Sequence, residues 1–203
     1  MNNIIVGLTG QTGAGKSTAS GFLREQGCNI INADLVAREA LAVGSDVLKR
    51  LALIFGSDII DKDGSCRRRL LAQRAFSSEE NTEILNKITH PWIKARIEEY
   101  IEMYKKSNDS VIVIDAPQLF ESGCDSVCDK VIAVIAPQSI RLERIIRRDS
   151  LSISEAQLRI NAQHSQEYYT RKSDFIIDGS LPLEEVRSVI AGLIRELSAL
   201  RGV

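Results

Sequence analysis

The sequence has few of the residues that build metal centres and disulfide frameworks. It contains four cysteines and two histidines, and no two cysteines form a CxxC pair. The histidines, His90 and His164, lie far apart in the chain. A structural zinc site needs closely spaced ligands of these types, so none is expected. The cysteines are predicted to be reduced thiols, as in a cytoplasmic protein.

The sequence also lacks a long apolar run and an excess of charge of either sign. Its longest largely apolar stretch, VIAVIAPQSI, is too short to cross a bilayer. The short apolar run that follows Met1 does not resemble a signal peptide. The formal net charge of −1 argues against a general binder of nucleic acids or membrane surfaces. We therefore expect a soluble, cytoplasmic protein with neither nucleic acid nor membrane as a partner. A monomer is also expected, although these features do not determine the oligomeric state.

Apolar runs and helical spacing alternate along the chain. Runs typical of strands buried on both faces occur at residues 4–9 and in CNIINAD, SVIVID, KVIAVIA and DFIID. Helical apolar spacing follows at 16–26 and 35–53, and again at 183–200. The alternation predicts an α/β fold with a doubly wound, parallel five-stranded sheet.

Two stretches depart from this alternation. Residues 66–106 carry helical spacing and many arginines without a strand signal, and residues 141–159 are rich in arginine. We expect a core formed by 1–60, 107–140 and 170–203, a helical insertion at 61–106 and a lid at 141–169. Within the insertion, Pro91 is expected at the first position of a helix, with His90 as its N-cap.

A glycine-rich loop follows the first predicted strand. Residues 10–17, GQTGAGKS, match G-x-x-x-x-G-K-[ST] between a strand and a helix, as the phosphate-binding motif of P-loop NTPases requires. The glycines let successive backbone N–H groups point at phosphate oxygens. Lys16 is expected to reach the β- and γ-phosphates, and the Ser17 hydroxyl to hold Mg²⁺. The residues predicted to bind ATP in this loop are Gly13, Ala14, Gly15, Lys16, Ser17 and Thr18.

A phosphate-binding loop does not by itself distinguish the classes of nucleotide enzyme. A switch GTPase needs an N-K-x-D segment, which the sequence lacks. A motor or transporter ATPase usually has a longer chain and an acidic pair after an apolar strand, whereas Asp115 is followed by Ala116. A kinase for a small acceptor is favoured. A nucleoside or nucleotide monophosphate kinase and a nucleotide-dependent binding switch are the alternatives.

Asp34 stands at the end of the second predicted strand, at the sheet edge where open α/β folds bind ligands. Its carboxylate could accept the proton of an attacking hydroxyl, or it could cap a helix that begins at Leu35. Arg38, one turn later, could pair with an anionic substrate or with Asp34. Asp115 also ends a strand, in a position suited to an outer-sphere contact with Mg²⁺.

The arginine-rich segment after the fourth strand suggests a lid that closes over the nucleotide. Arg144 and Arg148 share a helical face and are the better candidates to neutralise the transferring phosphoryl group. Arg147 and, in the insertion, Arg67 are expected to be solvated.

Nearly the whole chain resembles the dephospho-CoA kinase family. The resemblance rests on GLTGQTGAGKST, INADLVAR, DGSCRRRLLAQRAF, THPWI, APQLFESG, RLERIIRRD with a following AQ at Ala162-Gln163, and SDFIIDG, in that order. It implies transfer of the ATP γ-phosphoryl group to the ribose 3′-hydroxyl of dephospho-CoA, giving CoA and ADP, with Mg²⁺ as cofactor. It also implies that the insertion at 61–106 is the domain that binds the CoA moiety.

The resemblance also assigns roles by position. Asp34 falls on the family's catalytic acid–base residue. The remaining assignments are Arg38, Arg68 and His90 on the substrate side, and Arg144 and Arg148 on the lid side. His90 could instead be an N-cap without ligand contact.

Four positions depart from the family pattern. Asn32 replaces a common Asp, and Gln11 replaces a common Gly. Gln118 interrupts the usual P-L-L, and Gly179 replaces a common Asn near the adenine end.

Overall fold

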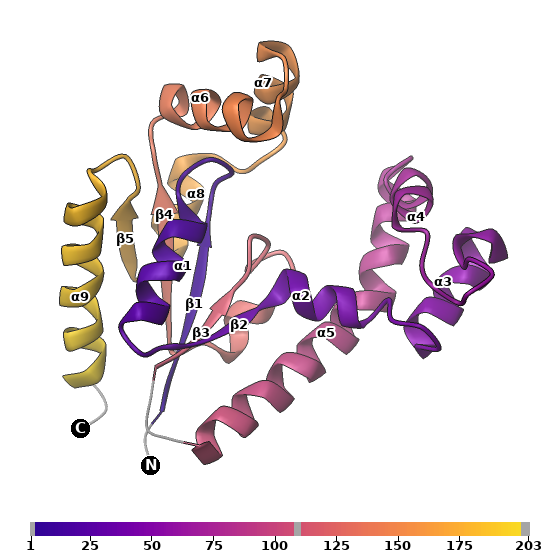
Figure 1. The fold of residues 1–203 in the computed structure, drawn as a ribbon, viewed down its shortest axis with the longest axis horizontal. Coiled ribbons are helices and arrows are strands. Elements are labelled where there is room, and N and C mark those ends of the chain that lie inside the picture. The colour runs from indigo at the N-terminus through magenta and orange to yellow at the C-terminus, as the bar shows by residue number, and fades with distance from the viewer. Residues whose placement is uncertain (1–2, 108–110, 200–203) are drawn as a thin grey trace. The chain divides into compact units, whose positions relative to one another are not determined.

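The computed structural model describes residues 3–107 and 111–199 and contains one five-stranded sheet of order β2-β3-β1-β4-β5 (Figure 1). The strands are β1 (Ile4–Gly10), β2 (Asn29–Asn32), β3 (Val111–Asp115), β4 (Lys130–Ile135) and β5 (Phe175–Asp178). β1 pairs in parallel with β3 on one side and β4 on the other, and β4 pairs in parallel with β5. The predicted α/β fold with a five-stranded sheet is confirmed.

The two central strands are buried because their sequences are apolar on both faces. All five residues of β3 are buried, and Val6 and Leu8 of β1 are fully inaccessible to solvent. The parallel register places Leu8 opposite Asp115. The last residues of β1 and the carboxylate that ends β3 therefore lie at the same edge of the sheet.

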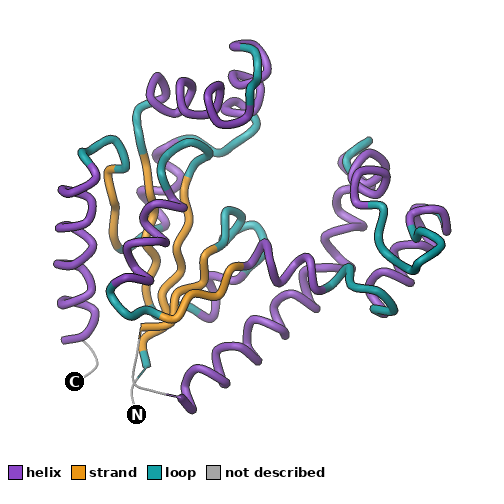
Figure 2. Tube along the Cα trace, viewed as in Figure 1, coloured by secondary structure: helices purple, strands orange, loops and turns teal. Residues whose placement is uncertain are grey.

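The chain divides into two compact units. The first unit, residues 1–31 and 103–203, contains most of the sheet and its covering helices (Figure 2). Its helices are α1 (Lys16–Glu25), η2 (Cys124–Val127), α6 (Gln138–Asp149), α7 (Ile153–Asn161), α8 (Gln166–Lys172) and α9 (Leu183–Ala199). Side chains of β1, β3, β4, α1 and α9 form its main core. Residue 200, the expected end of the last helix, lies outside the described residues.

The segment predicted as a lid has a small core of its own. Ile145 of α6 and Ala156 and Ile160 of α7 are buried together, with partly buried leucine and isoleucine side chains packed around them. Ser152 begins α7 with a capping box, in which its side chain accepts from the Glu155 N–H. The two helices are therefore joined by apolar contacts and by a well-defined turn.

The second unit, residues 32–102, is helical and has a separate core. It contains α2 (Ala33–Glu39), α3 (Asp46–Phe55), η1 (Ser57–Ile59), α4 (Arg68–Ala75) and most of α5 (Glu79–Ser107). The unit starts well before the insertion expected at 61–106, because α3 contributes Leu48, Leu51 and Phe55 to the same core as α4. The single helix expected at 35–53 is two helices, and Ser45 caps the second by accepting from the Val47 and Leu48 N–H groups.

The prediction that a helix begins at Pro91 is wrong. Pro91 lies inside α5, which runs without interruption from Glu79 to Ser107. A proline in a helix removes one backbone hydrogen bond and crowds the preceding turn. Here the helix continues because buried side chains precede and follow the proline, Ile88 at 7% and Ile97 at 0% exposure. His90 is consequently not an N-cap.

Within residues 3–107 and 111–199, no helix is long and apolar enough to span a membrane.

Candidate active site

The phosphate-binding loop is shaped by close backbone contacts. β1 ends at Gly10 and α1 begins at Lys16, and between them the Ala14 N–H donates to the Gln11 carbonyl at 3.0 Å. Gly13 has a φ of +76°, and a Cβ on it would lie 2.8 Å from the Arg141 carbonyl oxygen. Both the left-handed backbone and the lack of space require glycine there. The loop is therefore braced by the first turns of α6.

Lys16 and Asp115 form an ion pair at the carboxyl edge of the sheet. The Lys16 ammonium donates to Asp115 Oδ1, and the two side chains are 16% and 5% exposed. A buried carboxylate is costly unless it is paired, so Lys16 stabilises Asp115 at the end of β3. An ammonium has three N–H donors, so Lys16 retains N–H groups that can donate hydrogen bonds to a phosphate.

The same edge carries oxygen ligands that suit Mg²⁺. Ser17 lies exposed in the first turn of α1, and Asp115 supplies a carboxylate. Mg²⁺ commonly takes one or two protein oxygens and completes its shell with water and substrate phosphates. Ser17 and Asp115 fit that donor set. Across the described residues, no three His, Cys, Asp or Glu side chains gather as a metal-binding group.

The two predicted lid arginines have different partners. Arg144 donates from Nη1 to the Gly13 and Ala14 carbonyls at 3.2 and 3.3 Å and from Nη2 to the Gly179 carbonyl at 2.9 Å. Arg148 instead makes a two-point hydrogen bond with Asp149 at 2.8 Å. Of these two arginines, only Arg144 touches the phosphate-binding loop.

Gly179 explains one departure from the family pattern. A Cβ at this position would lie 1.9 Å from the Ala14 carbonyl oxygen and 3.1 Å from a Val134 methyl carbon. No side chain fits there without moving the loop, so in this chain the position contributes its backbone carbonyl, which Arg144 binds.

Residues after α7 also contact the loop, and the sequence did not predict these contacts, although Gln163 belongs to the motifs that carry the family resemblance. Gln163 Oε1 accepts from the Thr12 N–H at 2.8 Å, and the His164 carbonyl accepts from Gln11 Nε2 at 3.4 Å. His164 Nε2 lies 3.3 Å from Glu121. More than 40 residues separate the partners of each contact, so residue spacing carried no signal for them.

The predicted acceptor-side residues lie in the second unit. Asn32 caps α2 by accepting from the Leu35 N–H at 3.0 Å, so the alternative that Asp34 is the cap is wrong. Asp34 lies exposed in the first turn of α2, where a carboxylate interacts favourably with the helix dipole. Among the described residues, its carboxylate has no hydrogen-bond or ion-pair partner, Arg38 included. It is therefore available to a substrate.

The other acceptor-side candidates also present usable groups. Arg38, in the last turn of α2, and Arg68, the first residue of α4, are exposed. His90 is partly buried in α5, and this burial lowers the pKa of its imidazole. The ring is therefore neutral at pH 7 and can donate or accept one hydrogen bond at each nitrogen. Arg67 is exposed and forms an ion pair with Asp61 at 2.9 Å.

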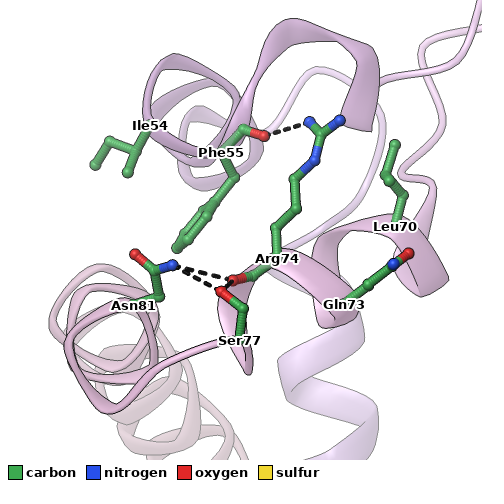
Figure 3. A pocket seen from close by; sticks show the side chains of 7 residues that line it. All are labelled: Ile54, Phe55, Leu70, Gln73, Arg74, Ser77 and Asn81. Carbon is green, nitrogen blue, oxygen red and sulfur yellow. Dashed lines mark hydrogen bonds between the residues drawn. The ribbon is translucent and has the colours of Figure 1, made fainter.

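The second unit also contains a pocket of about 550 Å³ (Figure 3). The residues that line it are Ile54, Phe55, Leu70, Gln73, Arg74, Ser77 and Asn81. Arg74 is engaged by Asp58, with N–O distances of 2.6 and 2.7 Å. Asn81 donates to the Arg74 carbonyl and to Ser77 Oγ. None of the predicted substrate residues lines this pocket, and its arginine already has a carboxylate partner.

Known proteins match the chain over almost its full length. The sequence model of the dephospho-CoA kinase family matches residues 4–185. A dephospho-CoA kinase of Corynebacterium diphtheriae is 40% identical over 193 residues, which cover 95% of this chain and 94% of that protein. One of Moorella thermoacetica is 37% identical over 194 residues, covering 95% and 92%.

Solved structures agree with this match. The crystal structure of TT1252 from Thermus thermophilus has a TM-score of 0.81 at 27% identity and covers 97% of this chain and 99% of its own. Dephospho-CoA kinase from Campylobacter jejuni has a TM-score of 0.64 at 27% identity, covering 96% and 97%. The resemblance inferred from the ordered motifs is confirmed. Because the family model matches residues 4–185 and these relatives are 37–40% identical over 95% of its length, the chain belongs to the dephospho-CoA kinase family.

Proposed function

We propose that this protein transfers the γ-phosphoryl group of ATP to the ribose 3′-hydroxyl of dephospho-CoA, giving CoA and ADP. The observation that carries the proposal is the Lys16–Asp115 pair beside the phosphate-binding loop, in a chain that matches the family over residues 4–185. Phosphoryl transfer asks a protein mainly for positioning and for stabilisation of negative charge. A partly buried ammonium beside oriented backbone N–H groups supplies both.

On the nucleotide side, the N–H groups of the loop bind the phosphates and Lys16 stabilises the charge that develops on the transferring group. Mg²⁺, when bound with ATP, would neutralise phosphate charge. The Ser17 hydroxyl would hold it directly and Asp115 through water. As Lys16 turns toward the phosphates, its bond to Asp115 weakens, so the Asp115 carboxylate would become available to help hold Mg²⁺.

On the acceptor side, Asp34 orients the ribose hydroxyl and accepts its proton. An exposed carboxylate without an internal partner suits this role, because no ion pair must break before the hydroxyl binds. Arg38 and Arg68 bind the diphosphate of dephospho-CoA as charge-assisted donors. His90 contributes a neutral hydrogen-bonding group. We assign the acceptor domain to residues 61–106 together with α2.

In the lid, Arg144 moves from the loop carbonyls to the nucleotide phosphates, and Arg148 joins it. Arg144→Ala should lower kcat and weaken ATP binding together, as the loss of a gating residue often does. Arg147→Ala, exposed on the same helix, is the matched control and should leave both constants unchanged. If Arg144→Ala has the kcat and ATP affinity of wild type, the proposed role of Arg144 in binding the nucleotide phosphates is wrong.

One assay separates this function from the alternatives. ADP formation is measured with dephospho-CoA, with nucleosides, with nucleoside monophosphates and without an acceptor. Turnover that requires dephospho-CoA supports the proposal. Turnover with a nucleoside or its monophosphate supports the alternative kinase, and slow turnover independent of any acceptor supports a binding switch. We further expect a cytoplasmic monomer that binds neither nucleic acid nor membrane.

A further inference from the structure

Arg141 is a buried cation for which the structure provides no anionic partner. Among the described residues, two charged residues are less than a tenth exposed, Asp115 and Arg141, each at 4%. Asp115 is paired with Lys16. The Nε and Nη1 atoms of Arg141 are buried and have no hydrogen-bond partner. A buried charge without a partner is strongly unfavourable, and native structures rarely keep one without a use for it.

Arg141 lies directly against the phosphate-binding loop. It is the fourth residue of α6, and a Cβ on Gly13 would be 2.8 Å from its carbonyl oxygen and 3.0 Å from its Cα. One turn later, Arg144 donates to the carbonyls of Gly13 and Ala14. Two arginines of one helix thus adjoin the loop. One of them is hydrogen-bonded to the loop, while the other keeps unused donors.

The surroundings of Arg141 leave its positive charge uncompensated. Burial lowers the pKa of its guanidinium, and the one opposing influence comes from Tyr169 of α8. Burial also raises the pKa of the Tyr169 phenol to about 12, so this partner is neutral at pH 7. The group that would satisfy Arg141 is an anion.

We propose that Arg141 is a further phosphate-binding residue, whose guanidinium receives the triphosphate of ATP as the anionic partner that the protein does not supply. The inference rests on the proposed use of ATP. A guanidinium presents paired N–H donors that match two phosphate oxygens, and it stays protonated even when partly desolvated. The backbone of Arg141 adjoins Gly13 of the loop, so its unpartnered guanidinium would add donors to the N–H groups of the loop.

Access to Arg141 requires a small rearrangement of the segment after α7. Gln163 Oε1 accepts from the Thr12 N–H, and the His164 carbonyl accepts from Gln11 Nε2 at the long distance of 3.4 Å. Both contacts are neutral hydrogen bonds, and a phosphate oxygen can replace Gln163 at the Thr12 N–H. Phosphate binding therefore exchanges weak contacts for charge-assisted ones.

Arg141→Met tests the inference, because methionine keeps the length of the side chain and removes the charge. Thermal unfolding is measured without ligand and with Mg²⁺ plus inorganic triphosphate or ATP. We expect Arg141→Met to unfold at a higher temperature than wild type without ligand, because an unpaired buried charge is gone. We also expect triphosphate and ATP to bind about 10- to 100-fold more weakly. Arg147→Met is the matched control from the exposed face of α6 and should change neither quantity.

The opposite result would overturn the assignment. If Arg141→Met unfolds at a lower temperature and binds triphosphate as tightly as wild type, Arg141 is only a packing residue. Should Arg141→Met fail to fold, Arg141→Gln carries the same comparison with a neutral polar side chain. A wild-type protein that binds triphosphate through Arg141 but does not phosphorylate dephospho-CoA supports this inference and contradicts the proposed function. An active wild type whose Arg141 variants bind triphosphate equally well contradicts this inference alone.

Discussion

The nucleotide side and the acceptor side of this protein differ in how far their functional side chains are already engaged. In the first unit, Lys16 is ion-paired to Asp115 and Arg144 is bonded to two loop carbonyls. In the second unit, Asp34 and Arg38 are exposed, and no hydrogen bond or ion pair joins their side chains to other described residues. Under the proposed function, the triphosphate would meet a preformed site, whereas the acceptor would meet groups that it must itself order.

The largest expected effect tests the acceptor side. Asp34→Asn keeps the shape of the side chain and removes the base, so kcat should fall by about 10²–10⁴. ATP affinity should stay near wild type, because the loop holds the phosphates. Steady-state kinetics with dephospho-CoA measure the first effect and ATP titration the second.

Asp115→Asn is the rival variant for the same role. If Asp115→Asn abolishes turnover while Asp34→Asn remains close to wild type, the general base is Asp115. The nucleotide side would then supply the base that the proposal assigns to the acceptor side.

The next effect tests the nucleotide side. Lys16→Ala removes the ammonium that stabilises the transferring group, which should lower kcat by about 10²–10³ and weaken ATP binding. It also leaves the buried Asp115 carboxylate without its cation, so the unfolding temperature should fall. Kinetics and thermal unfolding of the same preparation check both. Near-normal turnover with dephospho-CoA would contradict the phosphate-loop assignment.

A smaller effect probes how tightly the nucleotide side is packed. Gly179→Ala places a methyl group 1.9 Å from the Ala14 carbonyl oxygen, so the loop must shift. Overpacking of this kind costs about 1–3 kcal/mol of unfolding free energy. Urea unfolding measures the loss, and ATP affinity should fall with it. Gly21→Ala is the control, because its Cβ would meet no atom within 4 Å. Equal unfolding free energies of the two variants would show that the loop can shift at little free-energy cost.

The smallest effect concerns the pH dependence of the lid. Hydrogen bonds from Arg148 hold the pKa of the Asp149 carboxyl below its ordinary value. A carboxyl with a depressed pKa in the folded state contributes stability above its unfolded pKa, about 4. That contribution is lost as the pH falls through the folded value. The difference in unfolding temperature between wild type and Asp149→Asn should therefore be present at pH 6 and vanish toward pH 3.

Because the pair is solvent-exposed, the difference at pH 6 is expected to be slight. A constant difference at all pH values would show that Asp149 acts through its neutral hydrogen bonds.

Local sequence was sufficient for the parts of the fold whose signal lies within a few residues. The apolar runs predicted the five strands, and the spacing of Gly10, Gly15 and Lys16 predicted the turn from β1 to α1. Asp115 could be placed at the sheet edge because a parallel sheet brings the ends of its strands together. Such features depend on backbone geometry and on the alternation of apolar residues, which a sequence displays directly.

Tertiary structure decided the features that depend on distant partners. Pro91 reads locally as a helix start, but apolar burial on either side of it keeps α5 continuous. From the sequence, Gly179 suggests that a side-chain contact to the base is lost. In the structure, the Ala14 carbonyl oxygen occupies the space that a side chain at position 179 would need. In the sequence, Arg141 is one arginine of the arginine-rich segment predicted as a lid, and only the fold buries it beside Gly13 without an anionic partner. The close contacts of Gly179 and Arg141 join segments more than 100 residues apart, so no local pattern could determine them.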